Sequence, residues 1–235
     1  MNIALIIAGG TGKRTHQEIP KQFINIHNKP ILMYTLEGFQ MHPDIHAIEV
    51  VCIKGWHEVL SAYARQYNIS KLKWIVDGGE TGQESIRNGV FNLYDAADKS
   101  DIVVIHDGIR PLIDKAVLSD CISVCREYGN AVSSLPYNEQ IFKTADGLTS
   151  TEYIPRELLR RVQTPQAYFL EKLYYSYKKA FDEKIGIYGS SYTNTMMVEL
   201  GETLHFSAGS EKNIKITTTD DIDMFYALLK ISERF

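Results

Sequence analysis

Cysteine is scarce in this sequence, and long apolar runs and an excess of positive charge are missing from it. Cys52, Cys121 and Cys125 are odd in number and have no CxxC spacing, so a disulfide framework is not expected. Cys121 and Cys125 lie one helical turn apart, where we expect small hydrophobic side chains rather than half of a metal site. No apolar run approaches the roughly 18 to 20 residues that a membrane-spanning helix needs. The formal net charge of −4 argues against bulk binding to nucleic acid.

The first residues, MNIALIIAGG, have neither the basic leader nor the length of a secretory signal, and they are typical of a β-strand. A hydrophobic fraction of 44% and a charged fraction of 23% are those of an ordinary globular protein. We find no repeat, low-complexity tract or linker along the chain. We therefore expect a soluble, cytoplasmic protein in which residues 1–235 form a single domain.

Short apolar runs alternate with amphipathic segments through the first 130 residues. Unbroken apolar runs predict strands, and a 3.6-residue periodicity of apolar side chains predicts helices. The expected strands cover residues 3–8, 47–53, 73–76 and 101–105, and the expected helices cover 31–39, 56–67, 84–97 and 115–128. This pattern predicts an α/β fold with a doubly wound, mostly parallel sheet that helices cover on both faces.

The alternation stops after Pro136, where residues 140–155 are typical of two short strands around a turn at Asp146 and Gly147. No helix follows closely enough to cover such a hairpin. We interpret residues 137–160 as an arm that projects from the domain and reaches a second subunit. The alternative, a hairpin folded back on its own domain, is equally compatible with the sequence.

Glycine-rich or charged loops follow the expected strands, at the edge of a parallel sheet where ligands bind. The first loop, AGGTGKRT at residues 8–15, exposes backbone N–H groups beside basic side chains, which suits a polyphosphate. It is not a P-loop, because Ile7 stands where the first glycine is needed and Arg14 where Ser or Thr is needed. A dinucleotide GxGxxG pattern fails at Thr15.

Two further segments carry charged side chains that suit the same edge. Asp107 and Arg110 directly follow the fourth strand. Asp107 is expected to be a Mg²⁺ ligand beside phosphates, the partner of Arg110 in a structural ion pair, or both. We expect His106 to be a packing residue. The alternating segment NIKIT, residues 213–217, predicts a strand on which Lys215 points into the crevice, although an isolated surface lysine would give the same pattern.

Six motifs in this order resemble those of one family of enzymes. They are AGGTGKR (8–14), PKQF (20–23), the GG-x₅-S loop (78–85), HDGIRP (106–111), QTPQ (163–166) and NIKIT (213–217). The chain resembles the CTP-dependent cytidylyltransferases that act on sugar-alcohol phosphates, with 2-C-methyl-D-erythritol 4-phosphate or ribitol 5-phosphate as acceptor. The resemblance implies transfer of CMP from CTP to a polyol phosphate, release of pyrophosphate and a requirement for Mg²⁺.

The resemblance also implies roles for individual residues. Catalytic roles fall to Arg14, Lys21 and Lys215, around the triphosphate. Nucleotide contacts are implied for Ala8, Gly9, Gly10, Gly12, Lys13, Gly78, Gly79, Glu80, Ser85, Asp107 and Gly108, and a metal contact for Asp107. Acceptor contacts are implied for Arg110, Gln140, Arg156 and Thr164, with Arg156 delivered by the arm of the other subunit of a homodimer.

The chemistry implied by the resemblance needs no general base. A phosphate monoester has a second pKa of about 6, so the attacking oxygen is already largely ionised at neutral pH. The barrier is instead the approach of a dianion to a polyphosphate, which cationic side chains and Mg²⁺ lower by positioning the reactants and neutralising their charge.

Three positions depart from the family pattern near the substrates. Gly82 replaces the usual arginine of the cytosine loop, residues 138–140 replace a segment ending in Asp-Thr, and Asn194 leaves YTNT without the usual carboxylate. The changes cluster on the acceptor side more than around the triphosphate, so they bear on which acceptor is used. The loss of the Asp-Thr pair and the HDGIRP variant favour ribitol 5-phosphate or a related polyol phosphate over methylerythritol phosphate. Two other hypotheses remain open: a sugar-1-phosphate nucleotidyltransferase and a catalytically inactive nucleotide-binding module.

Overall fold

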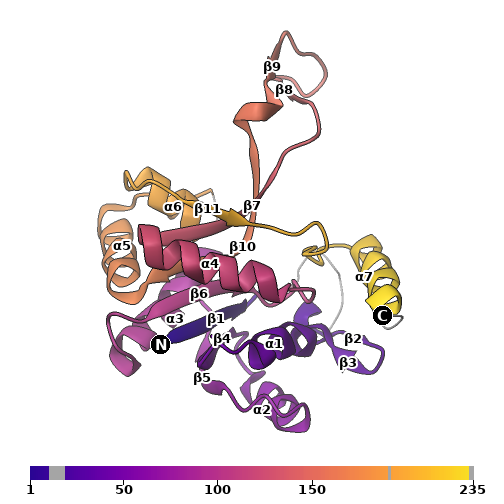
Figure 1. The fold of residues 1–235 in the computed structure, drawn as a ribbon, viewed down its shortest axis with the longest axis vertical. Helices are drawn as coiled ribbons and strands as arrows, with labels where there is room; N and C mark the ends of the chain where they lie inside the picture. Colours follow the sequence, from indigo (N-terminus) through magenta and orange to yellow (C-terminus); the bar gives the residue numbers. More distant parts are fainter. Residues whose placement is uncertain (11–18, 190–191, 233–235) are drawn as a thin grey trace.

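The fold was analysed in a computed structural model that describes residues 1–10, 19–189 and 192–232 (Figure 1). Among these residues, seven strands form one sheet in the order β11-β7-β10-β6-β1-β4-β5. They are β1 (Asn2–Ala8), β4 (Ala47–Cys52), β5 (Leu72–Asp77), β6 (Ile102–Asp107), β7 (Asn130–Pro136), β10 (Arg160–Phe169) and β11 (Phe206–Ala208). Neighbouring strands are parallel except at β10, which runs antiparallel to β6 and β7. The predicted mostly parallel sheet is confirmed.

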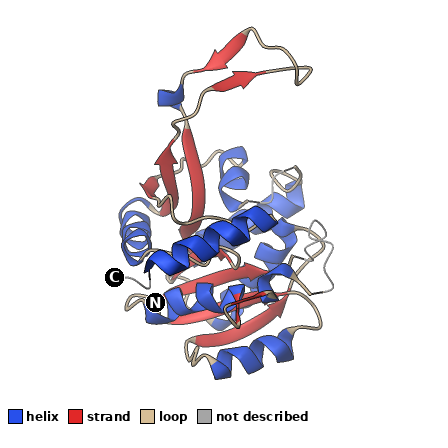
Figure 2. Ribbon diagram, turned by 90° about the vertical axis from the view of Figure 1, so that its right-hand side faces the viewer, coloured by secondary structure: helices blue, strands red, loops and turns tan. Residues whose placement is uncertain are grey.

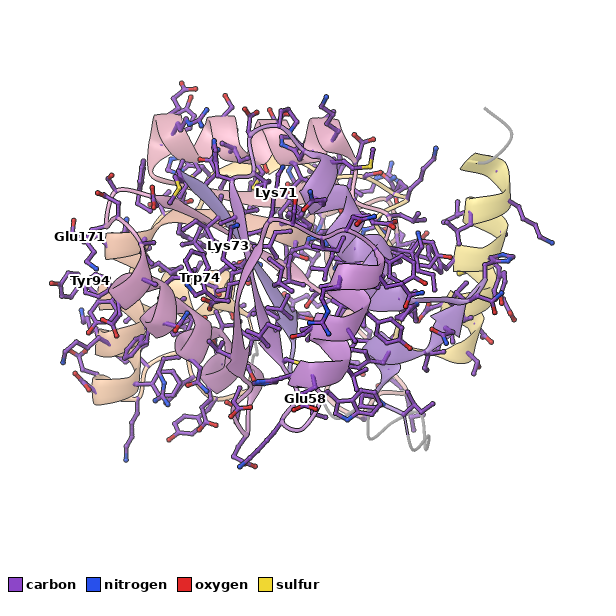
Figure 3. The ribbon with its side chains drawn as sticks, turned by 90° about the horizontal axis from the view of Figure 1, so that it is seen from below. Glu58, Lys71, Lys73, Trp74, Tyr94 and Glu171 are labelled. Carbon is purple, nitrogen blue, oxygen red and sulfur yellow. The ribbon has the colours of Figure 1, made fainter. Side chains whose placement is uncertain are left out.

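Helices cover both faces of the sheet (Figure 2). One layer contains α1 (Ile31–Met41), α2 (His57–Gln66) and α4 (Lys115–Tyr128), and the other contains α3 (Gly82–Ala96), α5 (Leu170–Glu183) and α6 (Thr193–Glu199). The side chains of β1 alternate between the two cores: Ala4 and Ile6 face the first, and Ile3 and Leu5 face the second. Trp74 on β5 and Tyr94 near the end of α3, labelled in Figure 3, pack against the second core.

Local signals fix the ends of the predicted helices. The side chain of Asp114 accepts a hydrogen bond from the N–H of Ala116 at the start of α4, and Gly129 ends this helix with a φ of 90°. Thr81 and Glu84 form a reciprocal capping box at the start of α3. The buried thiols of Cys121 and Cys125 lie within α4, and burial raises the pKa of each to about 12.

The C-terminal part of the chain packs beside its N-terminal part. Helix α7 (Thr219–Ser232) lies against the small hairpin of β2 (Asn25–Ile26) and β3 (Lys29–Pro30) (Figure 1). Phe225 of α7 is fully buried and shares a third core with Ile31 and Ile216. None of the described helices is long and apolar enough to cross a membrane.

The predicted hairpin projects from the body of the molecule (Figures 1 and 2). It consists of β8 (Ile141–Lys143) and β9 (Glu152–Ile154), followed by the 3₁₀ turn η3 (Arg156–Leu158). The side chain of Asp146 accepts hydrogen bonds from the N–H groups of Leu148 and Thr149, which lowers the pKa of Asp146 and shapes the turn. Leu148 and Leu158 remain 89% and 75% exposed. The alternative of a hairpin folded back on its own domain is wrong.

A buried carboxyl group lies between β4 and α3. Glu49 is fully buried; its Oε2 accepts a 2.6 Å hydrogen bond from Asn92, and its Oε1 has no partner among the described residues. Gly89 of α3 makes room for it, because a Cβ there would lie 2.9 Å from that oxygen. Burial raises the pKa of Glu49 to about 8, although the hydrogen bond from Asn92 opposes the shift.

We expect the free energy of unfolding to fall less steeply with rising pH in Glu49→Gln than in wild type. The folded state keeps a proton up to about pH 8 that the unfolded chain releases near 4.5, so the wild-type free energy of unfolding falls between these values. Relative to wild type, the glutamine variant should gain about 1.4 kcal/mol per pH unit in this window. Denaturant unfolding at about pH 5.5, 6.5 and 7.5 measures the difference between the two proteins. The contributions of His42 and His106 to the pH dependence cancel in this difference, because both proteins contain them.

The exposed Glu58 (Figure 3) provides the control, since Glu58→Gln makes the same change of side chain away from the buried site of Glu49. Parallel stability curves for wild type and Glu49→Gln would contradict the prediction.

Candidate active site

The strand order reverses beside β1, and a hollow opens there at the carboxyl ends of the strands. The chain passes from β1 outward to β4 and β5, then returns to place β6 on the other side of β1. Such a switch point is where open α/β sheets bind ligands. The edge hollow has a volume of about 650 Å³, and its wall includes Ala8, Gly9, Gly10, Lys21, Gln22, Gly79, Glu80, Thr81, Ser85, His106, Asp107, Thr164, Gln166, Tyr192, Thr193, Lys215 and Thr217.

The first glycine loop is fastened by a glutamine that the sequence analysis did not single out. Gln22, buried in the 3₁₀ turn η2 (Lys21–Phe23), donates from Nε2 to the carbonyl oxygens of Ala8 at 2.7 Å and Gly10 at 3.1 Å. The same turn places Lys21 on the wall of the edge hollow. Gly12, Lys13 and Arg14 lie outside the described residues.

The second glycine loop packs directly against the first. A Cβ added to Gly9 would lie 3.1 Å from the Cα of Gly78, so the backbones approach too closely for larger residues. Ser85 fixes the rest of this loop: its Oγ accepts from the N–H of Gly79 at 3.0 Å and donates to the carbonyl of Thr81 at 2.9 Å. The loop is therefore held in place before any ligand binds.

The acidic side chain after β6 lies between two cations. Asp107 contacts Lys215 Nζ at 3.1 Å and Arg110 Nε at 3.0 Å; these three residues form the Asp107 clamp. Burial alone would raise the pKa of Asp107, but Lys215 and Arg110 outweigh it and hold that pKa below its usual value. The ion pair anticipated between Asp107 and Arg110 is present, and Asp107 also lines the edge hollow.

The two residues that flank Asp107, His106 and Gly108, hold the turn after β6 in place. Gly108 lies behind the edge hollow, where its N–H bonds to the carbonyl of Ile7 at 2.9 Å and a Cβ would lie 3.0 Å from Leu32 Cδ1. His106 is fully buried, and Nε2 lies 3.1 Å from the carbonyl oxygen of Arg110. Burial lowers the pKa of His106 to about 4, so the ring is neutral at physiological pH and braces the turn.

The predicted strand at NIKIT is wrong, because residues 213–217 have no strand neighbour. The segment is anchored instead by its ends: Arg110 donates to the carbonyl of Asn213 at 2.7 Å, and the N–H of Ile216 donates to the carbonyl of Ile109 at 2.9 Å. Ile216 is nonetheless buried while Lys215 faces the edge hollow, so the two side chains lie where the alternation placed them.

The remaining acceptor residues are divided between the body and the arm. Thr164 lines the edge hollow, and its Oγ1 accepts from the N–H of Asp107 at 3.2 Å. Gln140 and Arg156 are exposed on the arm and do not line the hollow of their own chain. Tyr192, Thr193 and Gln22 are additional wall residues whose positions depend on contacts between distant segments, which no local pattern signals.

The donors at the edge hollow suit a hard divalent cation bound together with phosphates. No cluster of three or more His, Cys, Asp or Glu side chains capable of holding a metal occurs in the part of the chain that the structure describes. Mg²⁺ often needs only one or two carboxylates when substrate phosphates supply the other ligands. Asp107, ionised and at the hollow's wall, fits that requirement.

A switch-point hollow walled by two glycine-rich loops and by lysines suits a phosphate-bearing nucleotide, and the α/β fold that carries it is that of the nucleotidyltransferases. The family model described as IspD, 2-C-methyl-D-erythritol 4-phosphate cytidylyltransferase, matches residues 2–230. The chain belongs to this family, and it is a CTP-dependent nucleotidyltransferase.

Individual relatives carry two different names. A ribitol-5-phosphate cytidylyltransferase of Lacticaseibacillus paracasei is 54% identical over 233 residues, covering 99% of this chain and 100% of that protein. A 2-C-methyl-D-erythritol 4-phosphate cytidylyltransferase of Clostridium novyi is 35% identical, covering 97% of this chain and 96% of that protein. The crystal structure of 4-diphosphocytidyl-2C-methyl-D-erythritol synthase from Anaerococcus prevotii shares the fold, with a TM-score of 0.81 at 21% identity and coverage of 97% and 96%.

We expect Gln22→Met to weaken CTP binding about 10-fold while leaving the fold intact, because the first glycine loop loses both side-chain hydrogen bonds. Titration calorimetry with CTP measures the affinity. Gln40→Met is the matched control, since Gln40 bonds to Ser70 and Lys71 away from the edge hollow. Equal CTP affinities for wild type and Gln22→Met would show that Gln22 does not organise the loop for binding.

Proposed function

We propose that this protein transfers CMP from CTP to ribitol 5-phosphate and releases pyrophosphate. Cytidylyl transfer to a polyol phosphate follows from the family, and the 54% identical relative named for ribitol 5-phosphate supports the choice of acceptor. Composition and the absence of a membrane-spanning helix among the described residues support the further proposal of a one-domain, cytoplasmic enzyme.

The nucleotide is proposed to lie along the two glycine loops. Gly9, Gly10 and Gly79 leave backbone exposed at the wall of the edge hollow, where N–H groups suit phosphate oxygens and base edges. Glu80 and Ser85 lie on the same wall and are assigned to the cytosine end. The observation that carries the proposal is that Lys21 and Lys215, from opposite ends of the chain, line one hollow with these loops.

The reaction is proposed as a direct displacement at phosphorus. An ionised oxygen of the acceptor phosphate forms a bond to the α-phosphorus of CTP, and the bond from that phosphorus to the β-phosphate bridging oxygen breaks, so pyrophosphate leaves with its electron pair. The acceptor oxygen is already ionised at neutral pH, and a neutral, buried His106 is consistent with a site that needs no base. Lys21, Lys215 and Arg14 are assigned to stabilising the charge at the α-phosphorus.

Mg²⁺, with Asp107 and the substrate phosphates as its ligands, supplies further charge neutralisation when bound. Asp107 also contacts Lys215 and Arg110, so the same carboxylate that would bind the metal anchors these two cations. Thr164, hydrogen-bonded to the backbone of Asp107, is assigned to the acceptor phosphate together with Arg110.

The arm, residues 137–160, is proposed to complete the site of a second copy. Its apolar side chains Phe142 and Leu148 are exposed, and Gln140 and Arg156 lie on it outside their own edge hollow. Exposed apolar groups on a projecting hairpin are typical of a surface that a partner covers. We therefore propose a homodimer in which each arm brings Gln140 and Arg156 to the acceptor side of the other hollow.

The substrate pair is tested by following pyrophosphate release with each nucleoside triphosphate, Mg²⁺ and a panel of ribitol 5-phosphate, methylerythritol phosphate and glucose 1-phosphate. We expect turnover with CTP and ribitol 5-phosphate to have the highest kcat/KM. Faster turnover of methylerythritol phosphate would favour the acceptor in the family's description. Preference for another triphosphate with glucose 1-phosphate, or silence throughout, would reject the proposal.

The shared site is tested by mixing two inactive variants. Lys21→Ala alone is expected to lower kcat on the order of 100- to 1,000-fold, as for other groups that stabilise transition-state charge. If Arg156 acts on the partner's hollow, a mixed dimer of Lys21→Ala and Arg156→Ala contains one intact site. Random exchange then restores about one quarter of wild-type activity, because half of the dimers are mixed and half of their sites are intact.

The control for this experiment is a mixture of Lys21→Ala and Lys215→Ala. Both residues line the hollow of their own chain, so every site stays defective. No restoration with Arg156→Ala, or a protein that sediments as a monomer at assay concentrations, would reject the proposed dimer.

A further inference from the structure

Tyr192 contacts Lys215 through both its hydroxyl group and its ring. Tyr192 precedes α6 on the wall of the edge hollow, and Lys215 Nζ donates to its hydroxyl oxygen at 3.3 Å. The same ammonium lies 5.1 Å from the ring centroid, within reach of a cation–π contact. Lys215 Nζ also donates to Asp107 Oδ1 at 3.1 Å, so among the described residues its ammonium is held by two groups from different segments.

The backbone of Tyr192 is held by a hydrogen bond from the side-chain amide of a buried glutamine. Gln83, in the first turn of α3, is 1% exposed; its Nε2 donates to the carbonyl oxygens of Tyr192 at 3.1 Å and Gly186 at 3.0 Å. Its Oε1 accepts from the hydroxyl of Tyr177 at 3.0 Å. Since that hydroxyl has a single hydrogen, Thr193 donates in the 2.8 Å contact between Thr193 and Tyr177.

This network limits the movement of Tyr192. Displacing the tyrosine would leave a buried amide hydrogen without a partner, which costs more than the loss of an exposed hydrogen bond. Gln83 also lies within residues 78–85, the segment proposed to read cytosine, so the nucleotide side and Tyr192 share one rigid support.

We propose that Tyr192 is a positioning residue for Lys215 and thereby sets the rate of attack by the acceptor; this inference rests on the proposed function. Lysine has a flexible stem, and a single ion pair with Asp107 leaves its ammonium free to turn about that carboxylate. The hydroxyl supplies a second, uncharged anchor that leaves the positive charge available to the phosphates. Within the segment YTNT, Tyr192 is the residue whose side chain contacts Lys215 in the structure.

The variant Tyr192→Phe keeps the ring and removes the hydroxyl. We expect kcat to fall roughly 10-fold, the usual effect of losing a hydrogen bond to a charged group, with the Kd for CTP unchanged. Tyr188→Phe is the matched control, because Tyr188 lies on the same segment, is 69% exposed and does not line the edge hollow. Thermal melting of both variants verifies that they fold.

A double-mutant cycle separates positioning from direct contact with substrate. If Tyr192 acts through Lys215, Tyr192→Phe should change kcat less than about 2-fold in a Lys215→Ala background. An equal loss in both backgrounds, or no loss in the wild-type background, would overturn the inference.

A second readout needs no turnover and so stands apart from the proposed substrates. An amine held by two contacts is acylated slowly by a soluble reactive ester, and peptide mass spectrometry follows this reaction at Lys215. We expect Tyr192→Phe to speed it several-fold relative to wild type and Tyr188→Phe. Equal rates in all three proteins would overturn the role of Tyr192, whereas failure of wild type in the substrate panel with a slowed acylation of Lys215 would overturn the proposed function and leave the contact of Tyr192 with Lys215 intact.

Discussion

The carboxylate of Asp107 joins parts of the chain that the fold alone would leave separate. Strand β6 carries it to the sheet edge, Arg110 follows one turn later, and Lys215 arrives from a segment that no strand pairing fixes. Two cations this close would repel each other without the anion between them. The guanidinium of Arg110 also bonds to the carbonyl of Asn213, so the same cluster holds both the side chain and the backbone of the last motif.

Among the described residues, the edge hollow is lined by groups of fixed charge rather than by a group poised to exchange protons. The pKa of Asp107 is lowered and that of His106 is lowered to about 4, so both groups keep one protonation state across physiological pH. A reaction whose nucleophile is already ionised needs fixed charges rather than a group that exchanges protons. The glycine loops are also fixed in advance, because Gln22 and Ser85 form hydrogen bonds to their backbones without any phosphate bound.

Sequence patterns predicted the parts of the fold that depend on neighbouring residues. Periodicity predicted the helix over 115–128, which the structure shows capped by Asp114 and Gly129, and Asp146 with Gly147 predicted the tip of the arm. The position of charged residues after strands also predicted that Asp107 and Lys21 share an edge. The antiparallel direction of β10, the anchoring of Gln22 and the contact between Tyr192 and Lys215 escaped prediction, because each depends on pairings between distant segments. At NIKIT, alternation predicted the correct side for Lys215, but the strand that it also predicted is absent. Alternation describes the direction of side chains and does not show whether another backbone lies close enough to pair.

One half of the edge hollow is lined mainly by backbone and the other mainly by side chains. This difference affects how the family can accommodate different acceptors. On the side proposed for the nucleotide, Gly9 and Gly78 pack backbone against backbone, so a larger residue there would have to push the two glycine loops apart. On the acceptor side, the wall consists of side chains such as Tyr192 and Thr164 and is completed, in the proposed dimer, by Arg156 from the arm. Side chains can change without moving the backbone that carries them. Relatives named for ribitol 5-phosphate and for methylerythritol phosphate match nearly the whole of this chain, and a change of side chains on the half proposed to meet the acceptor would let one fold take either phosphate.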